Sequence, residues 1–197
     1  MNEPLPAGSR ERLFDAARTA HVFLKRPVHD ATLHALYEMY KWGPTSMNCQ
    51  PSRVLFVKSL DGKKRMLPAL YPGNVEKTMS APVTAIVAFD TQFFEFLPQQ
   101  FPPNPRARDM FSNDLALSFD TGMRNGTLQG AYLMIAARSL GLDVGPMSGF
   151  DAAAINAEFF RDGRWRVNFL INLGWADRTA FRPRGPRLAF DEAARIL

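Results

Sequence analysis

The sequence predicts an α+β fold in which helices flank a sheet. The predicted helices and strands are mixed without a regular β–α–β alternation, which argues against a doubly wound dinucleotide fold. One strand is apolar enough to lie inside a covered sheet, and one helix is long enough to form the centre of the core. The 197 residues, of which 46% are hydrophobic and 22% charged, fit one domain spanning residues 1–197.

Two helices are expected before the first strand. Ser9 can cap a helix that runs through Ala17, and Asp30 can cap a second helix in which apolar residues recur at helical spacing. These recurring residues are Leu33, Leu36, Tyr37 and Tyr40. The dipeptide Gly43-Pro44 should end the second helix, because proline disfavours helix in the residue before it.

Two strands with short helices between them follow. Residues 53–58 (RVLFVK) are rich in β-forming residues, and residues 82–89 (PVTAIVAF) predict a longer, covered strand. Short helices are expected near residues 62–67 and 74–80. Residues 97–108 (LPQQFPPNPRAR) contain four prolines, so we expect an irregular surface excursion that could form a lid.

A long core helix is expected over residues 115–140, with Gly141 as a natural stop. Its later half should turn one face to the core, made of Leu128, Ala131, Tyr132, Ile135 and Ala136. The remaining expected elements are a glycine-rich turn at 141–150, a helix capped by Asp151, a strand at 166–175 and a short docked helix at 191–197.

Composition narrows the setting in which the protein works. The single cysteine, Cys49, the absence of an export-like N-terminus and the absence of a membrane-spanning apolar window favour a cytoplasmic protein. The net charge of +5 arises largely from late arginines, namely Arg161, Arg164, Arg166, Arg178, Arg182, Arg184 and Arg187. They could form a solvated face or hold a phosphate-bearing cofactor or acidic substrate. Nucleic-acid binding comes third, because no RNA-recognition motif or zinc finger is present.

The sequence motifs of several common enzyme and nucleotide-binding classes are missing from this chain. The sequence contains no GxGxxG fingerprint, Walker A loop, HExxH motif or GxSxG elbow. Its three histidines, His21, His29 and His34, all lie in the first 34 residues, so we expect no metal site. Cys49 has no evident basic partner that would activate it, which favours a structural thiol.

Three segments crowd polar residues with glycine or proline: residues 18–23 (RTAHVF), 43–53 (GPTSMNCQPSR) and 141–151 (GLDVGPMSGFD). Read alone, the second could be a plain helix-ending loop and the third a set of turns. In their order and spacing, over nearly the whole chain, they resemble the nitroreductase family of flavoproteins. The resemblance implies a mixed, mainly antiparallel sheet in an intertwined homodimer, with FMN bound at the subunit interface.

The resemblance also implies which residues contact FMN. The residues that correspond to phosphate- and pyrimidine-binding positions are Arg18, Thr19, His21 and Arg187, with Arg184 or Arg182 assisting. The residues that match the family's PSxxNxQP loop, which reaches the flavin across the interface, are Pro44, Thr45, Ser46 and Asn48. The residues whose main chain should pass along the flavin ring are Met147, Ser148 and Gly149.

Two departures from the family pattern bear on the chemistry. Ala17 and His21 stand where basic residues are common, and Ser148 stands where many relatives carry glutamate. We therefore expect no catalytic side chain, since the cofactor carries the chemistry. The resemblance implies a ping-pong reaction in which NADH or NADPH delivers hydride to the flavin and an acceptor then takes it.

The segments 41–51, 82–90 and 140–151 look closest to the malonic semialdehyde reductases of pyrimidine degradation, whose product would be 3-hydroxypropionate. An acidic aldehyde would suit an arginine near the flavin, and Arg106, Arg108 and Arg124 are candidates. The alternative is a broader NAD(P)H nitroreductase or quinone reductase. A basic nucleic-acid-binding domain is a distant third.

Overall fold

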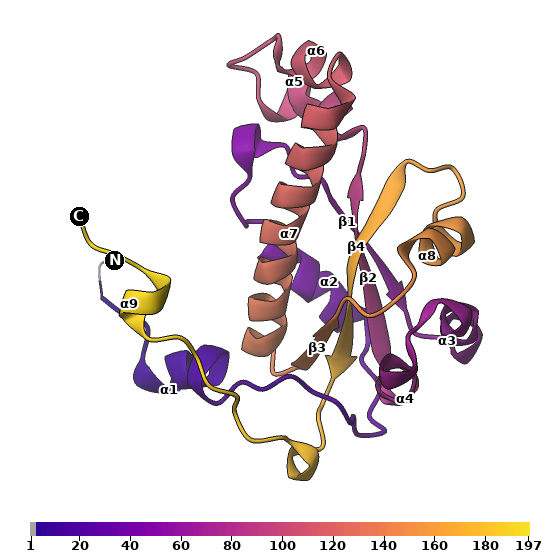
Figure 1. Ribbon diagram of the computed structural model, residues 1–197, viewed down its shortest axis with the longest axis vertical. Helices are drawn as coiled ribbons and strands as arrows, with labels where there is room; N and C mark the ends of the chain where they lie inside the picture. Colours follow the sequence, from indigo (N-terminus) through magenta and orange to yellow (C-terminus); the bar gives the residue numbers. More distant parts are fainter. Residues whose placement is uncertain (1–2) are drawn as a thin grey trace.

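The computed structural model describes residues 3–197 and has a four-stranded antiparallel sheet between two layers of helices (Figure 1). Its strands are β1 (Ser52–Val57), β2 (Val83–Asp90), β3 (Asp143–Met147) and β4 (Trp165–Gly174). They lie in the order β1-β2-β4-β3, and a parallel bridge joins Thr19 to Val144 beside β3. The expected α+β class is confirmed.

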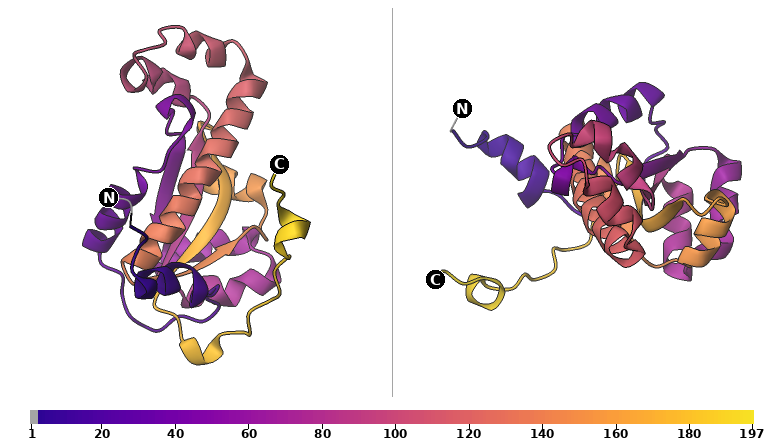
Figure 2. Two further views of the ribbon diagram at one scale, coloured as in Figure 1. Left: turned by 90° about the vertical axis from the view of Figure 1, so that its left-hand side faces the viewer. Right: turned by 90° about the horizontal axis from the view of Figure 1, so that it is seen from above.

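Helices cover both faces of this sheet. The α-helices are α1 (Ala7–Arg10), α2 (Asp30–Tyr40), α3 (Leu60–Met66), α4 (Pro72–Ser80), α5 (Leu97–Gln100), α6 (Ala107–Ser112), α7 (Leu115–Ser139), α8 (Ala152–Phe159) and α9 (Phe190–Ala193). Helices α2 and α7 pack on one face, and α3, α4 and α8 lie on the other (Figures 1 and 2).

The central strand β2 shows why the sheet needs both layers. All eight of its residues are buried, as expected for a covered strand. Its side chains alternate between faces, so Val87 packs in the cluster with α2 and α7, whereas Ile86 packs in the cluster with α8. Strands β1, β2 and β4 and helices α3 and α4 all begin within two residues of their expected starts.

Helix α7 has the expected length, but the expected core face is only partly right: Ala136 is buried in the core, whereas two larger members of that face are exposed. Leu128 is 48% exposed and Tyr132 is 42% exposed. The face that packs on the sheet instead carries small and polar residues, including Ser118, Gly122, Asn125, Gly126, Gln129 and Gly130. Asn125 and Gln129 can be buried because they accept hydrogen bonds from the backbone amides of Ser46 and Ser52.

Glycines allow α7 to approach the sheet closely. A β-carbon on Gly130 would lie 2.4 Å from Cζ of Phe169, and one on Gly122 would lie 2.8 Å from Cδ2 of Phe89. Each phenyl ring therefore fills the space that a larger helix residue would occupy. A hydrophobicity pattern cannot show this arrangement, because glycine and amide residues do not register as a core face.

The first helix begins earlier than expected. Helix α1 starts at Ala7 after Pro6, so Ser9 lies inside the helix and is not its cap. The amide of Ser9 itself donates to the Pro6 carbonyl oxygen at 3.0 Å. A π-helical turn, Glu11–Asp15, continues the helix and ends before Ala17. Likewise, Asp30 is the first helical residue of α2 and makes no side-chain cap.

The proline-rich segment is more regular than expected. Helix α5 forms because Pro98 lies in its first turn, where a missing amide hydrogen breaks no helical hydrogen bond. Helix α6 follows after a bend. The lobe formed by residues 93–112 has a small core of its own, containing Phe93, Phe94, Leu97, Ala107 and Phe111 together with Cys49.

The glycine-rich segment 141–150 contains the strand β3, which we had expected to be a turn. It interrupts the usual strand pattern with Gly145 and Pro146, yet proline is tolerated at a sheet edge, where β3 lies. Gly141 does end α7, with a left-handed φ of 87°. Asp151 does cap α8, since its carboxylate accepts from the Ala154 amide.

The C-terminal end does not dock as expected. A short helix, α9, forms close to the predicted place, but residues 182–197, which we call the C-terminal arm, extend away from the sheet (Figures 1 and 2). Residues 185–197 are exposed throughout, including Leu188, Phe190 and Ile196. The arm therefore presents apolar side chains that its own chain does not cover.

Lys63 gives the fold a testable pH dependence. Its side chain is 3% exposed, and its ammonium group donates to the carbonyl oxygens of Thr78 and Ala81 at the end of α4. Burial lowers the pKa of Lys63 from 10.5 to about 8. Between these two values the unfolded chain binds more protons than the folded one, so this residue makes the free energy of unfolding rise with pH.

We expect the stability of the wild type, measured relative to Lys63→Met, to rise by roughly 2 kcal/mol between pH 7.5 and 10.5. Urea unfolding at several pH values measures this difference. The raised pKa values of Cys49 and Tyr40 act equally in both proteins, so they cancel in the comparison. A difference that stays flat or falls over this interval would contradict the assignment.

Candidate functional site

A cavity of about 530 Å³ lies at the end of α7, between residues 14–21 and the beginning of the C-terminal arm. Five arginines line it and form what we call the basic cluster: Arg18, Arg138, Arg182, Arg184 and Arg187. Asp15 is the acidic side chain among the described residues that line this cavity. The sequence had predicted four of these five arginines as cofactor contacts or their assistants.

The basic cluster keeps its positive charge. Within residues 3–197, no member forms an ion pair with a carboxylate. Arg184 donates through Nη2 to the carbonyl oxygens of Phe14, Asp15 and Ala17, and Arg18 donates through Nη1 to those of Asp15 and Ala17. These bonds orient the guanidinium groups without neutralising them, which suits the site to an anion such as phosphate.

His21 also lines the cavity, and Lys77 lies near enough to His21 to affect its charge. The pKa of His21 lies below 6.5, first because of burial and then because of the positive charges of Lys77 and Arg182. The pKa of Lys77 is lowered by burial and by the charge of Arg182. The imidazole is therefore biased towards its neutral form, while α4 adds a lysine to the basic cluster's surroundings.

The predicted first and third segments meet along β3. The amide of Ala20 donates to the Val144 carbonyl oxygen at 2.9 Å, and Thr19 forms the parallel bridge with the same residue. A β-carbon on Gly145 would lie only 2.5 Å from the carbonyl oxygen of Ala20. This close approach fixes the backbone that carries Arg18 and His21 against the sheet.

We expect Gly145→Ala to destabilise the protein by about 2 kcal/mol, because backbone atoms must move to accommodate the new methyl group. The displaced segment 19–21 should also weaken ligand binding in the cavity. Thermal unfolding and FMN titration measure the two effects. Gly73→Ala is the matched control, since a β-carbon there meets nothing within 4 Å; equal effects in both variants would contradict the close-approach argument.

The end of β3 is held by α4. Asn74 donates through Nδ2 to the Gly149 carbonyl oxygen at 2.6 Å, and the Tyr71 amide donates to the same oxygen at 3.1 Å. A β-carbon on Gly149 would lie 2.6 Å from Nδ2 of Asn74. The side chain of Met147 is buried in the core, whereas Ser148 is exposed. This segment can therefore offer main chain to a ligand.

The predicted loop of residues 44–50 has a strained backbone. Met47, Asn48 and Gln50 have φ angles of 51°, 49° and 40°, all in the left-handed region. Each such conformation costs on the order of 1–3 kcal/mol in a non-glycine residue and persists only where the surroundings enforce it. Strain of this kind often marks a segment shaped for binding.

Hydrogen bonds hold this strained loop beside the first half of α7. The Ser46 amide donates to Oδ1 of Asn125 at 2.8 Å, and the Gln50 amide donates to the hydroxyl of Thr45 at 3.2 Å. The basic cluster, by contrast, contains Arg138 from the last turn of α7. Within one chain, the strained loop and the basic cluster thus lie towards opposite ends of this helix (Figure 1).

Cys49 is the buried member of the strained loop. Burial raises the pKa of its thiol to about 11, although the Thr45 side chain counteracts part of the effect. The thiol is therefore protonated near neutral pH and packs with the lobe of residues 93–112. This environment fits the interpretation of Cys49 as a structural residue.

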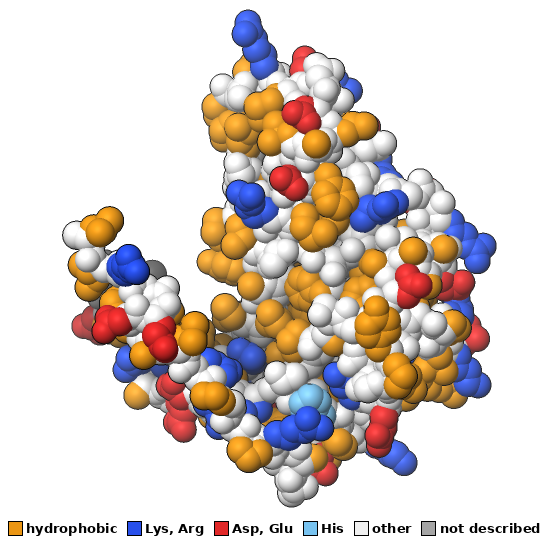
Figure 3. Space-filling model, in the orientation of Figure 1, with side chains coloured by type: hydrophobic (Ala, Val, Ile, Leu, Met, Phe, Trp, Pro, Cys, Tyr) orange, Lys and Arg blue, Asp and Glu red, His pale blue; other side chains and the backbone are white. Residues whose placement is uncertain are grey.

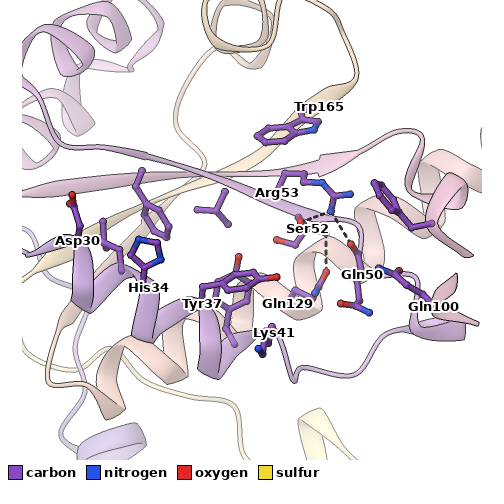
Figure 4. Close-up of a pocket in the computed structure, with 15 residues that line it drawn as sticks. Asp30, His34, Tyr37, Lys41, Gln50, Ser52, Arg53, Gln100, Gln129 and Trp165 are labelled. Carbon is purple, nitrogen blue, oxygen red and sulfur yellow. Dashed lines mark hydrogen bonds between the residues drawn. The ribbon is translucent and has the colours of Figure 1, made fainter.

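A second cavity, of about 630 Å³, runs along the free edge of β1 between α2 and the lobe (Figure 4). Tyr37 and Trp165 form part of its aromatic walls, and His34 lies towards one end. Gln50 and Arg53 lie at the other end, next to the strained loop. This cavity shares no lining residue with the cavity that holds the basic cluster.

Comparison with known proteins places these features in a family. Residues 1–175 match the model of the nitroreductase family. The chain belongs to this family. It is 50% identical over 200 residues to a protein of Rhodopseudomonas palustris (strain TIE-1) and 51% identical over 197 residues to one of Polynucleobacter asymbioticus. Both are named as NADH dehydrogenase/NAD(P)H nitroreductase, and each match covers 100% of both chains.

The fold also matches solved nitroreductase structures. A nitroreductase from Exiguobacterium sibiricum, solved in complex with FMN, superposes with a TM-score of 0.84. The two chains are 20% identical, and the match covers 94% of this chain and 96% of the other. This likeness confirms the nitroreductase-like fold expected from the sequence.

The family motifs led to most of the candidate residues, but not to all of them. Arg138, Lys77 and Asn74 were missed, because they come from α7 and α4, which carry no motif. Their only sequence signal was a polar residue inside a helix, which is common.

In the described part of the chain, no helix is long and apolar enough to span a membrane.

Proposed function

We propose that this protein is an FMN-dependent NAD(P)H oxidoreductase. The observation that carries the proposal is the un-neutralised basic cluster placed directly beside the main chain of β3. The names of the relatives and the FMN in the Exiguobacterium structure support the same activity. When bound, FMN would accept hydride from NAD(P)H and pass it to an acceptor.

The residues present fit FMN. A cavity of about 530 Å³ is within the range of ordinary cofactor sites. Arg18, Arg184 and Arg187 would bind the phosphate, and Thr19 and His21 would supply polar contacts near it. The main chain of residues 147–149, which lacks a bulky side chain at Gly149, would lie along the ring.

We further propose that the active form is an intertwined homodimer. One chain cannot present both the strained loop and the basic cluster to a single cofactor, because they lie towards opposite ends of α7. A two-fold axis across α7 would bring the loop of one copy to the basic cluster of the other. The exposed Leu128 and Tyr132 would then be buried at the centre of the interface.

Exposed apolar surface supports the same arrangement. Trp42 is 77% exposed, and the C-terminal arm carries Leu188, Phe190 and Ile196 in the open. Figure 3 shows the arm held away from the body of the chain, with hydrophobic side chains facing the hollow between them. Apolar surface of this extent on one chain is typical of a protein–protein interface.

The first experiment is an absorption spectrum of the purified protein, with heat release and chromatographic identification of any cofactor. Light scattering of the same sample gives its mass. Released FMN and a dimeric mass would support the proposal. A colourless protein that takes up no added FMN would overturn it, and steeply salt-dependent binding to nucleic acid would then favour the basic-surface alternative.

We propose malonic semialdehyde as the acceptor, which one hydride and one proton from water would convert to 3-hydroxypropionate. The support is the sequence resemblance of residues 41–51, 82–90 and 140–151. The three candidate arginines, Arg106, Arg108 and Arg124, are all exposed, and Arg108 forms an ion pair with Asp109. Within one chain, none of them therefore lies in a pocket that would bind the substrate carboxylate. A higher kcat/KM on nitroaromatics or quinones than on malonic semialdehyde would favour the broader reductase instead.

A further inference from the structure

We infer that Arg53 is a positioning residue, whose guanidinium group locks the strained loop in the shape that meets the cofactor. The identity of the cofactor in this inference rests on the proposed FMN-binding function, but the contacts of Arg53 do not depend on it. Arg53 is the second residue of β1 and comes two positions after the family motif ends at Pro51, and neither its residue type nor its position there suggests more than a strand residue. Its contacts indicate otherwise.

The first contact is with the strained backbone. Arg53 donates through Nη1 to the carbonyl oxygen of Gln50 at 3.0 Å, a bond drawn in Figure 4. Gln50 is the last left-handed residue of the loop. Its side chain donates through Nε2 to Oδ1 of Asn48 at 2.9 Å. A shift of Gln50 would therefore be transmitted to Asn48, a predicted cofactor residue.

The second contact anchors the arginine itself. Arg53 donates through Nη2 to Oδ2 of Asp90 at 2.9 Å, and this carboxylate is 1% exposed. Because the Asp90 side chain is buried at the end of β2, it gives the guanidinium group a fixed point in the sheet. The guanidinium group also lies over the ring of Phe96, 5.4 Å from its centroid, in the lobe. Arg53 thus connects the sheet to the loop.

Arg164 offers a matched comparison. It also binds Asp90, through Nε at 3.0 Å and Nη2 at 3.2 Å, and it also lies over Phe96, at 6.0 Å. It makes no contact with Gln50 among the described hydrogen bonds. The two arginines therefore share an anchor and an aromatic neighbour, but only Arg53 reaches the strained loop.

The protein contains a reporter that does not depend on FMN. Cys49 is the single cysteine of the chain, and it is 1% exposed between Asn48 and Gln50. If Arg53 holds this loop, then Arg53→Met should release Gln50 and expose the thiol. Asp90 would keep Arg164 and the Gln92 amide as partners, so its charge would not be left unpaired in the core.

The experiment measures thiol labelling and FMN affinity in wild type, Arg53→Met, Arg53→Lys and Arg164→Met. We expect Arg53→Met to label at least tenfold faster with a neutral thiol reagent and to bind FMN about tenfold more weakly, as loss of a charged hydrogen bond predicts. Arg164→Met should stay within about twofold of wild type. Arg53→Lys should be intermediate, because one ammonium group cannot bridge Gln50 and Asp90 as a guanidinium group does.

Equal labelling in Arg53→Met and Arg164→Met would overturn the inference, since the effect would then belong to the shared anchor. Wild-type labelling in Arg53→Met would overturn it too. If Arg53→Met fails to fold, Arg53→Lys decides: faster labelling at an unchanged unfolding temperature supports the role, and wild-type labelling overturns it. A wild type that takes up no FMN overturns the proposed function, while the labelling comparison still tests Arg53.

Discussion

FMN is expected to bind at least about 100-fold more tightly than riboflavin, which differs from it only by the missing phosphate. The basic cluster has no carboxylate partner within residues 3–197, so its arginines are free to donate to an anion. Hydrogen bonds between charged groups contribute about 1.5–3 kcal/mol each, and two of them would account for this ratio. Fluorescence titration of the apoprotein with the two flavins measures it.

Single substitutions then show which arginines recognise the phosphate. Arg18→Gln and Arg187→Gln should each lower the ratio of FMN affinity to riboflavin affinity about tenfold. The affinity for FMN should fall, and the affinity for riboflavin should stay nearly unchanged. Arg178→Gln is the control, because Arg178 is 70% exposed, pairs with Asp143 and does not line the cavity. Similar affinities for FMN and riboflavin in the wild type would show that the basic cluster does not hold the phosphate.

Local sequence signals predicted the elements whose structure is determined locally. The covered strand β2 is apolar at nearly every position, and Gly141 takes the left-handed conformation that ends α7. Asp151 caps α8 through a hydrogen bond only three residues away. The motif segments were found for a similar reason, since each crowds its unusual residues within about ten positions.

The features that sequence did not reveal depend on distant contacts. Asn125 and Gln129 are buried in α7 because they accept from amides of Ser46 and Ser52, nearly 80 positions away. An apolar periodicity therefore selected a neighbouring face of the helix, which shares Ala136 with the buried face. Lys77 was missed for the same reason, because only folding brings α4 next to His21.

Removal of the C-terminal arm is expected to abolish FMN binding and dimerisation together. A chain that ends at Phe181 loses Arg182, Arg184 and Arg187, and with them the larger part of the basic cluster. It also loses the exposed apolar side chains that the proposed dimer would cover. Light scattering and FMN titration should find a colourless monomer.

A second truncation separates the two roles of the arm. A chain that ends at Arg187 keeps the basic cluster but lacks Leu188, Phe190 and Ile196. On dilution, its dimer should dissociate at protein concentrations at which the full chain is still dimeric. The amount of FMN bound should follow the amount of dimer that remains. Both truncated chains should still fold, because residues 182–197 are exposed and add nothing to the clusters around the sheet. If the shorter chain stayed dimeric and yellow, neither the arm nor its arginines could form the site, and the remaining arginines, Arg18 and Arg138, would have to bind the phosphate alone.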